Sequence, residues 1–280
     1  MKYSPNDINN NLKKYDFNFK KKFGQNFIVD ENIIDGIINK ADIKEDTLVI
    51  EVGPGSGSLT YKLCQKAKQV VCFEIDTTLK DILDSNLNEF NNVDIIYQDF
   101  LNVNLKEALK NYEYKHLYLV ANLPYYITTP IITKLIEDNI DIDKIVVMVQ
   151  KEVGSRFSAK PQSKDYNSLS IFLQYNFNIK KVMDISRNVF IPKPNVDSII
   201  VEFTKKEKIK VNDLELFYNL VKDSFVQKRK TLRNNLKKYN LEKIEEVLVK
   251  HGFDLNARAE QLSIEIFIDI SNHISHITNK

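Results

Sequence analysis

The sequence predicts an α/β protein in which a Rossmann-like, doubly wound sheet is followed by a small all-helical domain. A short apolar strand at 48–52 runs directly into a turn with glycines at 53, 55 and 57, and then into an amphipathic stretch at 58–67. This is a strand, a glycine turn and a helix. Strand and helix patterns then alternate as far as about residue 204, which is typical of a parallel sheet covered by helices.

Each element is assigned from its hydrophobic period. Further strand patterns follow the first one at 70–73, 93–97, 117–121, 145–149 and 199–203. Apolar residues recur at helical spacing at 33–40 and 168–174, and near the C-terminus at 214–221, 244–248 and 264–268. We therefore expect an N-terminal arm and docking segment at 1–27, an α/β catalytic domain at 28–204 and a helical domain at 205–280, with a charged linker at 204–210.

Four successive strands deliver polar or glycine residues at their carboxyl ends. These residues are Gly53, Glu74, Asp99 and Asn122, and open α/β sheets bind ligands at that edge. The Gly-x-Gly-x-Gly spacing differs from the Gly-x-Gly-x-x-Gly of dinucleotide folds and suits a nucleoside ligand without phosphate, such as S-adenosylmethionine. Glu74, about 20 residues after Gly53, is placed to accept hydrogen bonds from a ribose diol, and Asp99 from an adenine amino group. The alternative for either acid alone is a helix cap or a solvated loop residue.

Two aromatic motifs indicate a site for one flat nucleobase. They are Asn122-Leu123-Pro124-Tyr125 and Phe190-Ile191-Pro192-Lys193-Pro194. Tyr125 and Phe190 offer stacking faces, while the side-chain amide of Asn122 and the carbonyl of Pro124 offer adjacent acceptors for an exocyclic amino group. Each motif alone is also compatible with an ordinary turn or a rigid loop.

With these residues in place, the chain resembles the rRNA adenine N6-dimethyltransferases, and within that family the small-subunit (16S) group. The likeness covers almost the whole chain, and the order and spacing of the matching blocks agree: 22–27, 51–57, 122–125, 150–153, 190–198, 228–236 and 258–262. The resemblance implies the sheet of a class I S-adenosylmethionine-dependent methyltransferase. It places the methyl donor against Asn26, Ile28, Gly53, Glu74, Asp99 and Asn122, and the target adenine between Tyr125 and Phe190.

The implied activity is N6,N6-dimethylation of two adjacent adenosines near the 3′ end of 16S rRNA in the immature 30S subunit, with a role in small-subunit biogenesis. Hydrogen bonds to Asn122 and Pro124 would aim the nitrogen lone pair at the methyl carbon, so that positioning supplies much of the catalysis. Two alternatives stay open. One is a 23S rRNA adenine methyltransferase that confers macrolide-type resistance, and the other is a mainly non-catalytic ribosome-assembly or transcription factor.

The chain departs from the family pattern at three positions. Ile28 stands where Leu is usual, Ser56 where a bulky apolar residue is usual, and Asn167 where Gly is usual. The first two concern the lining of the donor pocket, and the third depends on whether Asn adopts a positive φ. None of them removes a group that the chemistry needs.

Charge distribution predicts the RNA-binding surface, because the net charge of +2 does not. No acidic residue occurs from 224 to 241, and this run carries Lys228, Arg229, Lys230, Arg233, Lys237 and Lys238. We expect a basic helix here that contacts RNA phosphates. A second basic group comprises Lys13, Lys14, Lys20, Lys21 and Lys22. For both groups the alternative is a solvated face.

Other residue types limit the possible classes. Cys64 and Cys72 have no metal-ligand spacing and are expected to be reduced thiols in a cytoplasmic protein. The histidines form no ligand cluster, and no apolar run approaches the roughly 18 to 20 residues of a membrane span. We therefore expect a monomer that needs no metal and no membrane.

Overall fold

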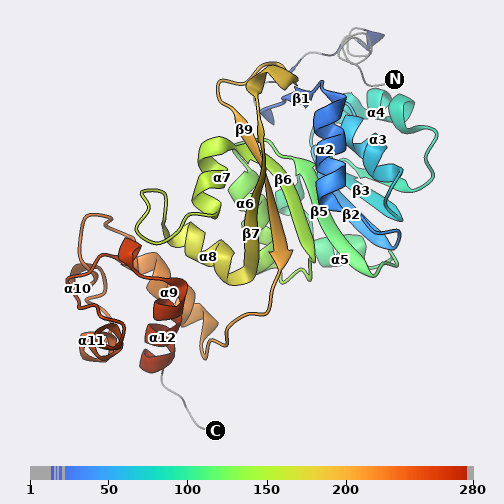
Figure 1. Ribbon diagram of the computed structural model, residues 1–280. Coiled ribbons are helices and arrows are strands. Elements are labelled where there is room, and N and C mark those ends of the chain that lie inside the picture. The colour runs from blue at the N-terminus through green and yellow to red at the C-terminus, as the bar shows by residue number, and fades with distance from the viewer. Residues whose placement is uncertain (1–13, 16, 18, 21–22, 276–280) are drawn as a thin grey trace. The chain divides into compact units, whose positions relative to one another are not determined.

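The computed structural model describes residues 14, 15, 17, 19, 20 and 23–275, and Figure 1 shows its elements. The strands are β1 (Phe27–Ile28), β2 (Thr47–Val52), β3 (Gln69–Phe73), β4 (Val93–Ile96), β5 (His116–Asn122), β6 (Lys144–Gln150), β7 (Phe177–Ile185), β8 (Phe190–Ile191) and β9 (Ser198–Lys205). The α-helices are α2 (Glu31–Ala41), α3 (Ser58–Cys64), α4 (Lys80–Leu87), α5 (Leu105–Leu109), α6 (Thr128–Glu137), α7 (Lys151–Phe157), α8 (Ser168–Asn176), α9 (Leu214–Ser224), α10 (Leu232–Asn235), α11 (Leu241–Lys250) and α12 (Ile264–Ile274). Short 3-10 helices are η2 (Thr77–Leu79), η3 (Phe100–Asn102), η4 (Arg187–Val189) and η5 (Ala259–Gln261).

Seven strands form one sheet in the order β4-β3-β2-β5-β6-β9-β7. β2 pairs in parallel with β3 on one side and with β5 on the other, and the pairs β3/β4 and β5/β6 are also parallel. β9 is antiparallel to β6. The strand order therefore reverses at β2, and the carboxyl ends of β2 and β5 meet at this switch point, where such sheets bind ligands. The predicted doubly wound sheet is confirmed.

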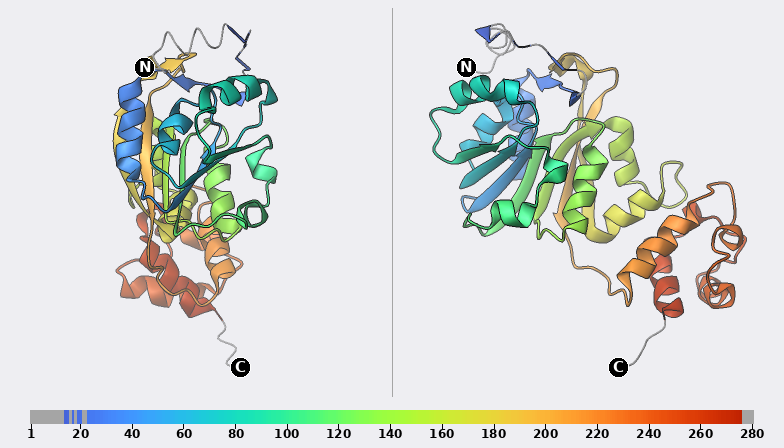
Figure 2. Two further views of the ribbon diagram at one scale, coloured as in Figure 1. Left: turned by 90° about the vertical axis from the view of Figure 1, so that its right-hand side faces the viewer. Right: turned by 180° about the vertical axis from the view of Figure 1, so that it is seen from behind.

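Helices cover both faces of the sheet. The edge-on view in Figure 2 shows α2 on one side of the strands and α5 and α6 on the other. Ile34 and Ile37 of α2 share a buried cluster with Val49 of β2 and Val120 of β5. Because both faces are covered, the central strands are buried throughout their inner residues and read as continuous apolar runs.

The chain divides into two compact units, and their composition differs from the predicted domains. The first unit holds the described residues up to Gly154 together with Lys180–Lys205, and the second holds Ser155–Ile179 together with the described residues from Lys206 onward. The division after Lys205 lies next to the boundary predicted at 204. Residues 155–179 differ from the prediction because Tyr166, Ile171 and Tyr175 complete a buried cluster with Phe217 and Phe267 of the C-terminal helices.

The basic run at 224–241 is not the helix that its composition predicts. Residues 225–230 form turns and bends, and between the end of α9 at Ser224 and the start of α11 at Leu241 only Leu232–Asn235 is helical. The backbone N–H groups of Leu232 and Arg233 donate to the carbonyls of Ala257 and Leu255 at 2.8 and 3.0 Å. These tertiary bonds hold the run as a loop followed by one helical turn.

Some local features could not be predicted from the hydrophobic periodicity of the sequence. β1 and β8 form a separate antiparallel pair in which Phe27 faces Ile191 and Ile28 faces Phe190, and two-residue strands are too short to show a period. β7 was not predicted because charged and apolar residues are mixed along it. Asn167 needs no positive φ: its φ is −158°, and its side chain caps α8 by accepting from the N–H groups of the first turn.

Candidate active site

A cavity of about 230 Å³ lies at the carboxyl edge of the sheet, within the first unit. Its lining brings together all the residues that the sequence predicts to hold the methyl donor: Asn26, Ile28, Gly53, Glu74, Asp99 and Asn122. Pro124 and Tyr125 also line the cavity, whereas the described residue Phe190 lies outside this lining.

The glycine turn after β2 forms one wall of the cavity. Gly53, Gly55 and Gly57 have positive φ values of 73°, 59° and 83°. Residues with a Cβ rarely adopt this conformation. A Cβ on Gly55 would also lie 2.8 Å from Cε1 of Phe27. The turn therefore offers a backbone surface on which a ligand can lie closely.

Glu74 follows β3 and is 5% exposed. Its Oε1 accepts from the N–H of Asp76 at 2.8 Å, and its Oε2 accepts from the N–H of Gly55 at 3.4 Å. Burial raises the pKa of Glu74 to about 7, although these two backbone hydrogen bonds oppose the rise. No cation among the described residues pairs with this carboxylate, which leaves it available as a strong acceptor for the hydroxyl groups of a ribose.

Asp99 lies three residues after β4, where it caps a short helix and also lines the cavity. Its Oδ1 accepts from the N–H of Leu101 at 3.0 Å and so caps η3. The same side chain is half-buried and lines the cavity. A helix cap at this place therefore does not prevent contact with a ligand.

Asn122 ends β5 with its side-chain amide held in one orientation. Its Nδ2 donates to the carbonyl of Asn26 at 2.8 Å, and Nδ2 of Asn26 donates to the carbonyl of Gly24 at 3.0 Å. No described residue donates to Oδ1 of Asn122, so this oxygen is a free acceptor at the cavity. Because an amide can present either its oxygen or its nitrogen, the bond to Asn26 decides which chemistry Asn122 offers.

The carbonyl of Pro124 is already engaged, in contrast to the oxygen of Asn122. It accepts from the N–H of Ile127 at 3.2 Å and from the hydroxyl of Thr128 at 3.4 Å, which closes the turn before α6. The second acceptor predicted for the target amino group therefore has a structural partner before any base is bound. Its role toward the base stays a prediction.

The two predicted stacking rings are placed differently. The hydroxyl of Tyr125 lies 2.7 Å from Oγ of the buried Ser198, a hydrogen bond that holds the ring at the cavity. Phe190 is only 3% exposed and packs in the core opposite Ile28. Tyr126, which is 57% exposed, is a further aromatic residue at the cavity. Stacking of a base between Tyr125 and Phe190 stays a prediction.

Glu51 is a buried acid of the cavity lining to which sequence reasoning gave no role. It is 1% exposed and accepts from the hydroxyl of Thr60 at 2.6 Å and from Sγ of Cys72 at 3.6 Å. Burial raises the pKa of Glu51 to about 8. Its position two residues before Gly53, inside an otherwise apolar strand, is the signal that could have identified it.

The predicted RNA-binding residues lie in the second unit and are all exposed. The side chains of Arg229 and Lys230 have no partner among the described residues. Nζ of Lys228 donates to the carbonyl of Lys164 at 2.8 Å, and Arg233 lies 3.7 Å from Glu245, which is a weak ion pair. Three of these four charges are therefore free of acidic partners and can meet phosphates.

The N-terminal basic group is different. Lys13, Lys21 and Lys22 lie outside the described residues, and Nζ of Lys14 lies 5.3 Å from the ring centre of Tyr15. Nζ of Lys20 lies 2.6 Å from Oδ1 of Asp76, so this charge is neutralised within the protein. Lys20 does not present the free charge that the sequence predicts for a phosphate contact.

Within the described part of the chain, no three His, Cys, Asp or Glu side chains gather as metal ligands. None of the described helices is both long and apolar enough to cross a membrane. Cys64 and Cys72 are free and buried.

S-adenosylmethionine fits the residues of the cavity. The glycine turn has no side chains to obstruct a close ligand, and the buried Glu74 carboxylate has only backbone donors as partners. Asn122 adds a free oxygen acceptor. These groups match the hydroxyl and amino donors of a nucleoside.

Comparison with known proteins identifies a family of methyltransferases. The family model of ribosomal RNA adenine dimethylase matches residues 16–276. A ribosomal RNA small subunit methyltransferase A from Bacillus pumilus is 47% identical over 271 residues, which is 93% of each chain. A protein of the same name from Bacillus licheniformis is 45% identical over 95% of this chain and 94% of its own.

Solved structures share the fold. A dimethyladenosine transferase from Plasmodium falciparum has a TM-score of 0.72 and 26% identity, over 87% of this chain and 95% of that chain. The 23S rRNA methyltransferase ErmE has a TM-score of 0.71 and 24% identity, over 89% of this chain and 99% of its own.

The sheet and its cavity thus define a class I methyltransferase that uses S-adenosylmethionine as its methyl donor. The chain belongs to the ribosomal RNA adenine dimethylase family.

Proposed function

We propose that this enzyme transfers two methyl groups from S-adenosylmethionine to N6 of each of two adjacent adenosines near the 3′ end of 16S rRNA, in the immature 30S subunit. The observation that carries the proposal is the fixed amide of Asn122, which presents a free oxygen at a donor cavity in a chain of this family. Relatives named for the small ribosomal subunit support 16S rRNA as the substrate. Methylation of the immature 30S subunit would be a step of small-subunit biogenesis. We further propose that the enzyme is a cytoplasmic monomer.

The cavity residues divide the work of holding the donor. Glu74 accepts from the ribose hydroxyls, Asp99 accepts from the adenine amino group, and the turn at Gly53 lies against the amino-acid part. Asn26 and Ile28 close the cavity from the N-terminal side. The bound donor supplies an electrophilic methyl group on a positively charged sulfur.

The target adenine is positioned by Asn122 and by the turn that follows it. The N6 nitrogen is a weak nucleophile because its lone pair is delocalised into the ring. In the first transfer, Oδ1 of Asn122 accepts one N6 hydrogen and the Pro124 carbonyl accepts the other, which turns the lone pair toward the methyl group. The N6–methyl bond forms as the sulfur–methyl bond breaks, S-adenosylhomocysteine leaves, and the methylated nitrogen releases one proton to solvent. In the second transfer, one N6 hydrogen remains for these two acceptors, and it is released in the same way. The Tyr125 ring, held by Ser198, stacks on the base, and Phe190 is proposed as the opposite face. Such positioning accounts for much of the rate gain in a transfer between two bound groups.

Phosphate contacts from Lys228, Arg229, Lys230 and Arg233 position the RNA without reading its bases. The exposed, largely unpaired charges of this run support the assignment. Base selection then belongs to the catalytic unit.

The test is incorporation of labelled methyl groups from S-adenosylmethionine into unmethylated 30S and 50S particles. We expect label in 30S particles, located to the two adenosines by primer extension. The control is Asn122→Ala, which should keep its fold and its binding to the particle but transfer little label.

The outcome separates the candidate functions. Label in 50S particles instead of 30S particles would establish the 23S rRNA alternative. Binding of 30S particles without any transfer would favour the non-catalytic assembly factor, and either result would overturn the proposal.

A further inference from the structure

The N-terminal segment is here Lys20 together with residues 23–26, which are described residues before β1. It contacts one residue at the end of β5 and another that follows β3. On the side of β5, the carbonyl of Asn26 accepts from Asn122. Gly24, with a φ of 59°, approaches the ring of Tyr126 so closely that a Cβ there would lie 3.3 Å from it. Residues 23–28 all line the cavity. The segment therefore forms part of the cavity wall and also touches the turn that holds the target base.

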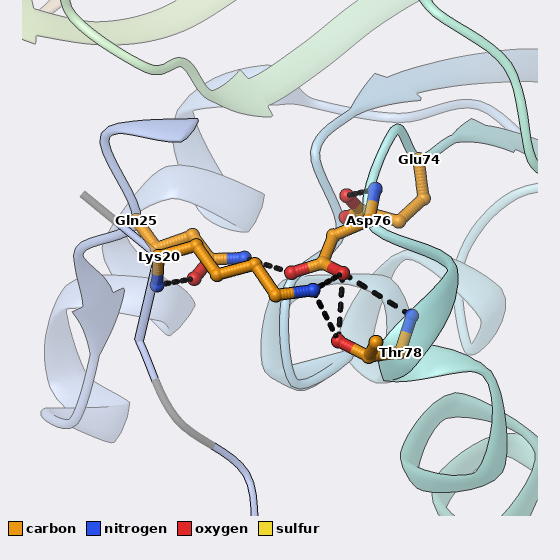
Figure 3. Close-up of polar contacts among 5 residues, drawn as sticks. All are labelled: Lys20, Gln25, Glu74, Asp76 and Thr78. Atoms are coloured by element: carbon orange, nitrogen blue, oxygen red, sulfur yellow. Dashed lines mark hydrogen bonds and ion pairs between the residues drawn. The ribbon is translucent and has the colours of Figure 1, made fainter. Parts of the chain in front are cut away.

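On the other side, the same segment is bound to Asp76, as Figure 3 shows. Nζ of Lys20 donates to Oδ1 of Asp76 at 2.6 Å, and Nε2 of Gln25 donates to Oδ2 at 2.8 Å. The amide of Gln25 is itself oriented, because its Oε1 accepts from the N–H of Lys20 at 2.8 Å. Thr78 also donates to Oδ1 through its hydroxyl at 2.7 Å. We call the contacts of Lys20 and Gln25 with Asp76 the clasp.

The clasp differs from a surface ion pair in the burial of its carboxylate and in the number of hydrogen bonds that this carboxylate accepts. Asp76 is only 2% exposed, and both of its oxygens accept hydrogen bonds from the N-terminal segment. A charge-assisted bond to a buried carboxylate is much stronger than an exposed pair. The hydrogen bonds from Lys20, Thr78 and Gln25 also outweigh the effect of burial and hold the pKa of Asp76 below its usual range.

Asp76 is connected directly to the donor-binding acid. Its own N–H donates to Oε1 of Glu74, and Oε2 of Glu74 accepts from Gly55 in the glycine turn. A continuous set of hydrogen bonds thus runs from Lys20 and Gln25 through Asp76 to Glu74 (Figure 3). A further hydrogen bond joins Glu74 to Gly55 of the turn. Any movement of the segment away from Asp76 removes part of the cavity wall and leaves a buried carboxylate without its cation.

We propose that Lys20 and Gln25 are positioning residues which, through Asp76, hold the N-terminal segment closed over the bound methyl donor and so set the rate at which the donor leaves. The inference rests on the proposed donor cavity. It adds a role for two residues to which the proposed donor site assigns no direct contact. Opening of the clasp releases the donor, and closing it places Asn26 where it orients the amide of Asn122.

The test compares Lys20→Met, Asp76→Asn and the double variant with the wild-type protein. Asp76→Asn keeps an oxygen that can cap η2, and Lys20→Met keeps the aliphatic part of the side chain. The dissociation rate of S-adenosylmethionine, measured by stopped-flow displacement, should rise about 10-fold in each single variant, as is typical for loss of a charge-assisted bond. The double variant should rise no further than about 10- to 20-fold, because both changes remove the same contact.

Two further measurements distinguish positioning from general damage. KM for S-adenosylmethionine should rise about as much as the dissociation rate, while kcat at saturating donor changes less than about threefold, since the contact is shared by the ground and transition states. Lys20→Arg should restore most of the affinity. Lys44→Met is the matched control, because Lys44 pairs with the exposed Asp42 at 2.7 Å and should have no effect on donor release.

Glu74→Ala distinguishes a failure of the clasp from a failure of the proposed donor cavity. This variant should weaken donor binding about 10- to 100-fold by removing charge-assisted bonds. If it does so while Lys20→Met and Asp76→Asn release the donor at the wild-type rate, the clasp is refuted and the cavity assignment stands. Additive effects of the two clasp variants would also refute the clasp. Unchanged binding by Glu74→Ala would overturn the cavity assignment and the clasp with it.

Discussion

We expect donor binding to depend on pH through Glu74. This carboxyl lies in the donor cavity, and burial raises its pKa to about 7 in the donor-free protein. The ionised form accepts hydrogen bonds from ribose hydroxyls more strongly than the neutral form. With a pKa near 7, the ionised fraction falls about tenfold between pH 8 and pH 6. The affinity for S-adenosylmethionine should therefore fall by up to about tenfold over this range.

The same shift predicts an opposite effect on stability. The unfolded carboxyl has a pKa of 4.5, and the folded protein favours its protonated form. The stabilising contribution is therefore fully present below pH 4.5 and is lost as pH rises through about 7. A difference of about 2.5 pKa units corresponds to roughly 3 kcal/mol. The charge that improves donor binding at pH 8 thus costs the free protein stability.

The difference between the wild type and Glu74→Gln gives the part of both effects that depends on Glu74, including its electrostatic coupling to Glu51. Calorimetric titration with S-adenosylmethionine at pH 6, 7 and 8 should show weaker binding by the variant at pH 8 and a smaller change with pH. Urea unfolding at pH 4.5 to 8 should show that the variant loses roughly 3 kcal/mol less stability than the wild type. Because the donor is the same in both titrations, its own ionisation cancels in the comparison. Identical pH profiles for the two proteins would refute the role given to Glu74.

Three further predictions follow from the site and the basic run. Asn122→Ala should lower kcat on 30S particles by about 100-fold or more while leaving fold and RNA binding intact, since it removes one preorganised polar group; single-turnover rates above a tenth of the wild-type rate would contradict this. Gly55→Ala should lower stability by about 1 to 3 kcal/mol and weaken donor binding, because a Cβ there meets Phe27 at a φ of 59°; an unchanged melting temperature together with unchanged donor affinity would disprove it. Replacing Lys228, Arg229 and Arg233 together by Ala should leave donor binding intact and reduce the slope of log affinity for 30S particles against log salt by roughly 0.7 to 0.9 for each phosphate that the variant no longer binds; the same slope and affinity as the wild type would show that the run is only a solvated surface.

The sequence by itself determined the fold class and the donor side of the site. Alternating strand and helix patterns are local, so they predict a doubly wound sheet directly. Residues at the ends of parallel strands must meet at one edge, so the order of the strand patterns was enough to group Gly53, Glu74, Asp99 and Asn122. Residue type also identified the turn at 53–57, because glycine readily adopts the positive φ that the structure shows there.

Only the tertiary structure decided the features that depend on distant partners. The basic run forms a loop and not a helix because it bonds to residues 255–257. Phe190 is buried because it pairs with Ile28, far away in the chain. The orientation of the Asn122 amide is set by Asn26, and the charge of Lys20 is neutralised by Asp76, which lies 56 residues away. Such contacts leave no period or motif in the sequence, because they depend on how the whole chain packs and not on the order of neighbouring residues.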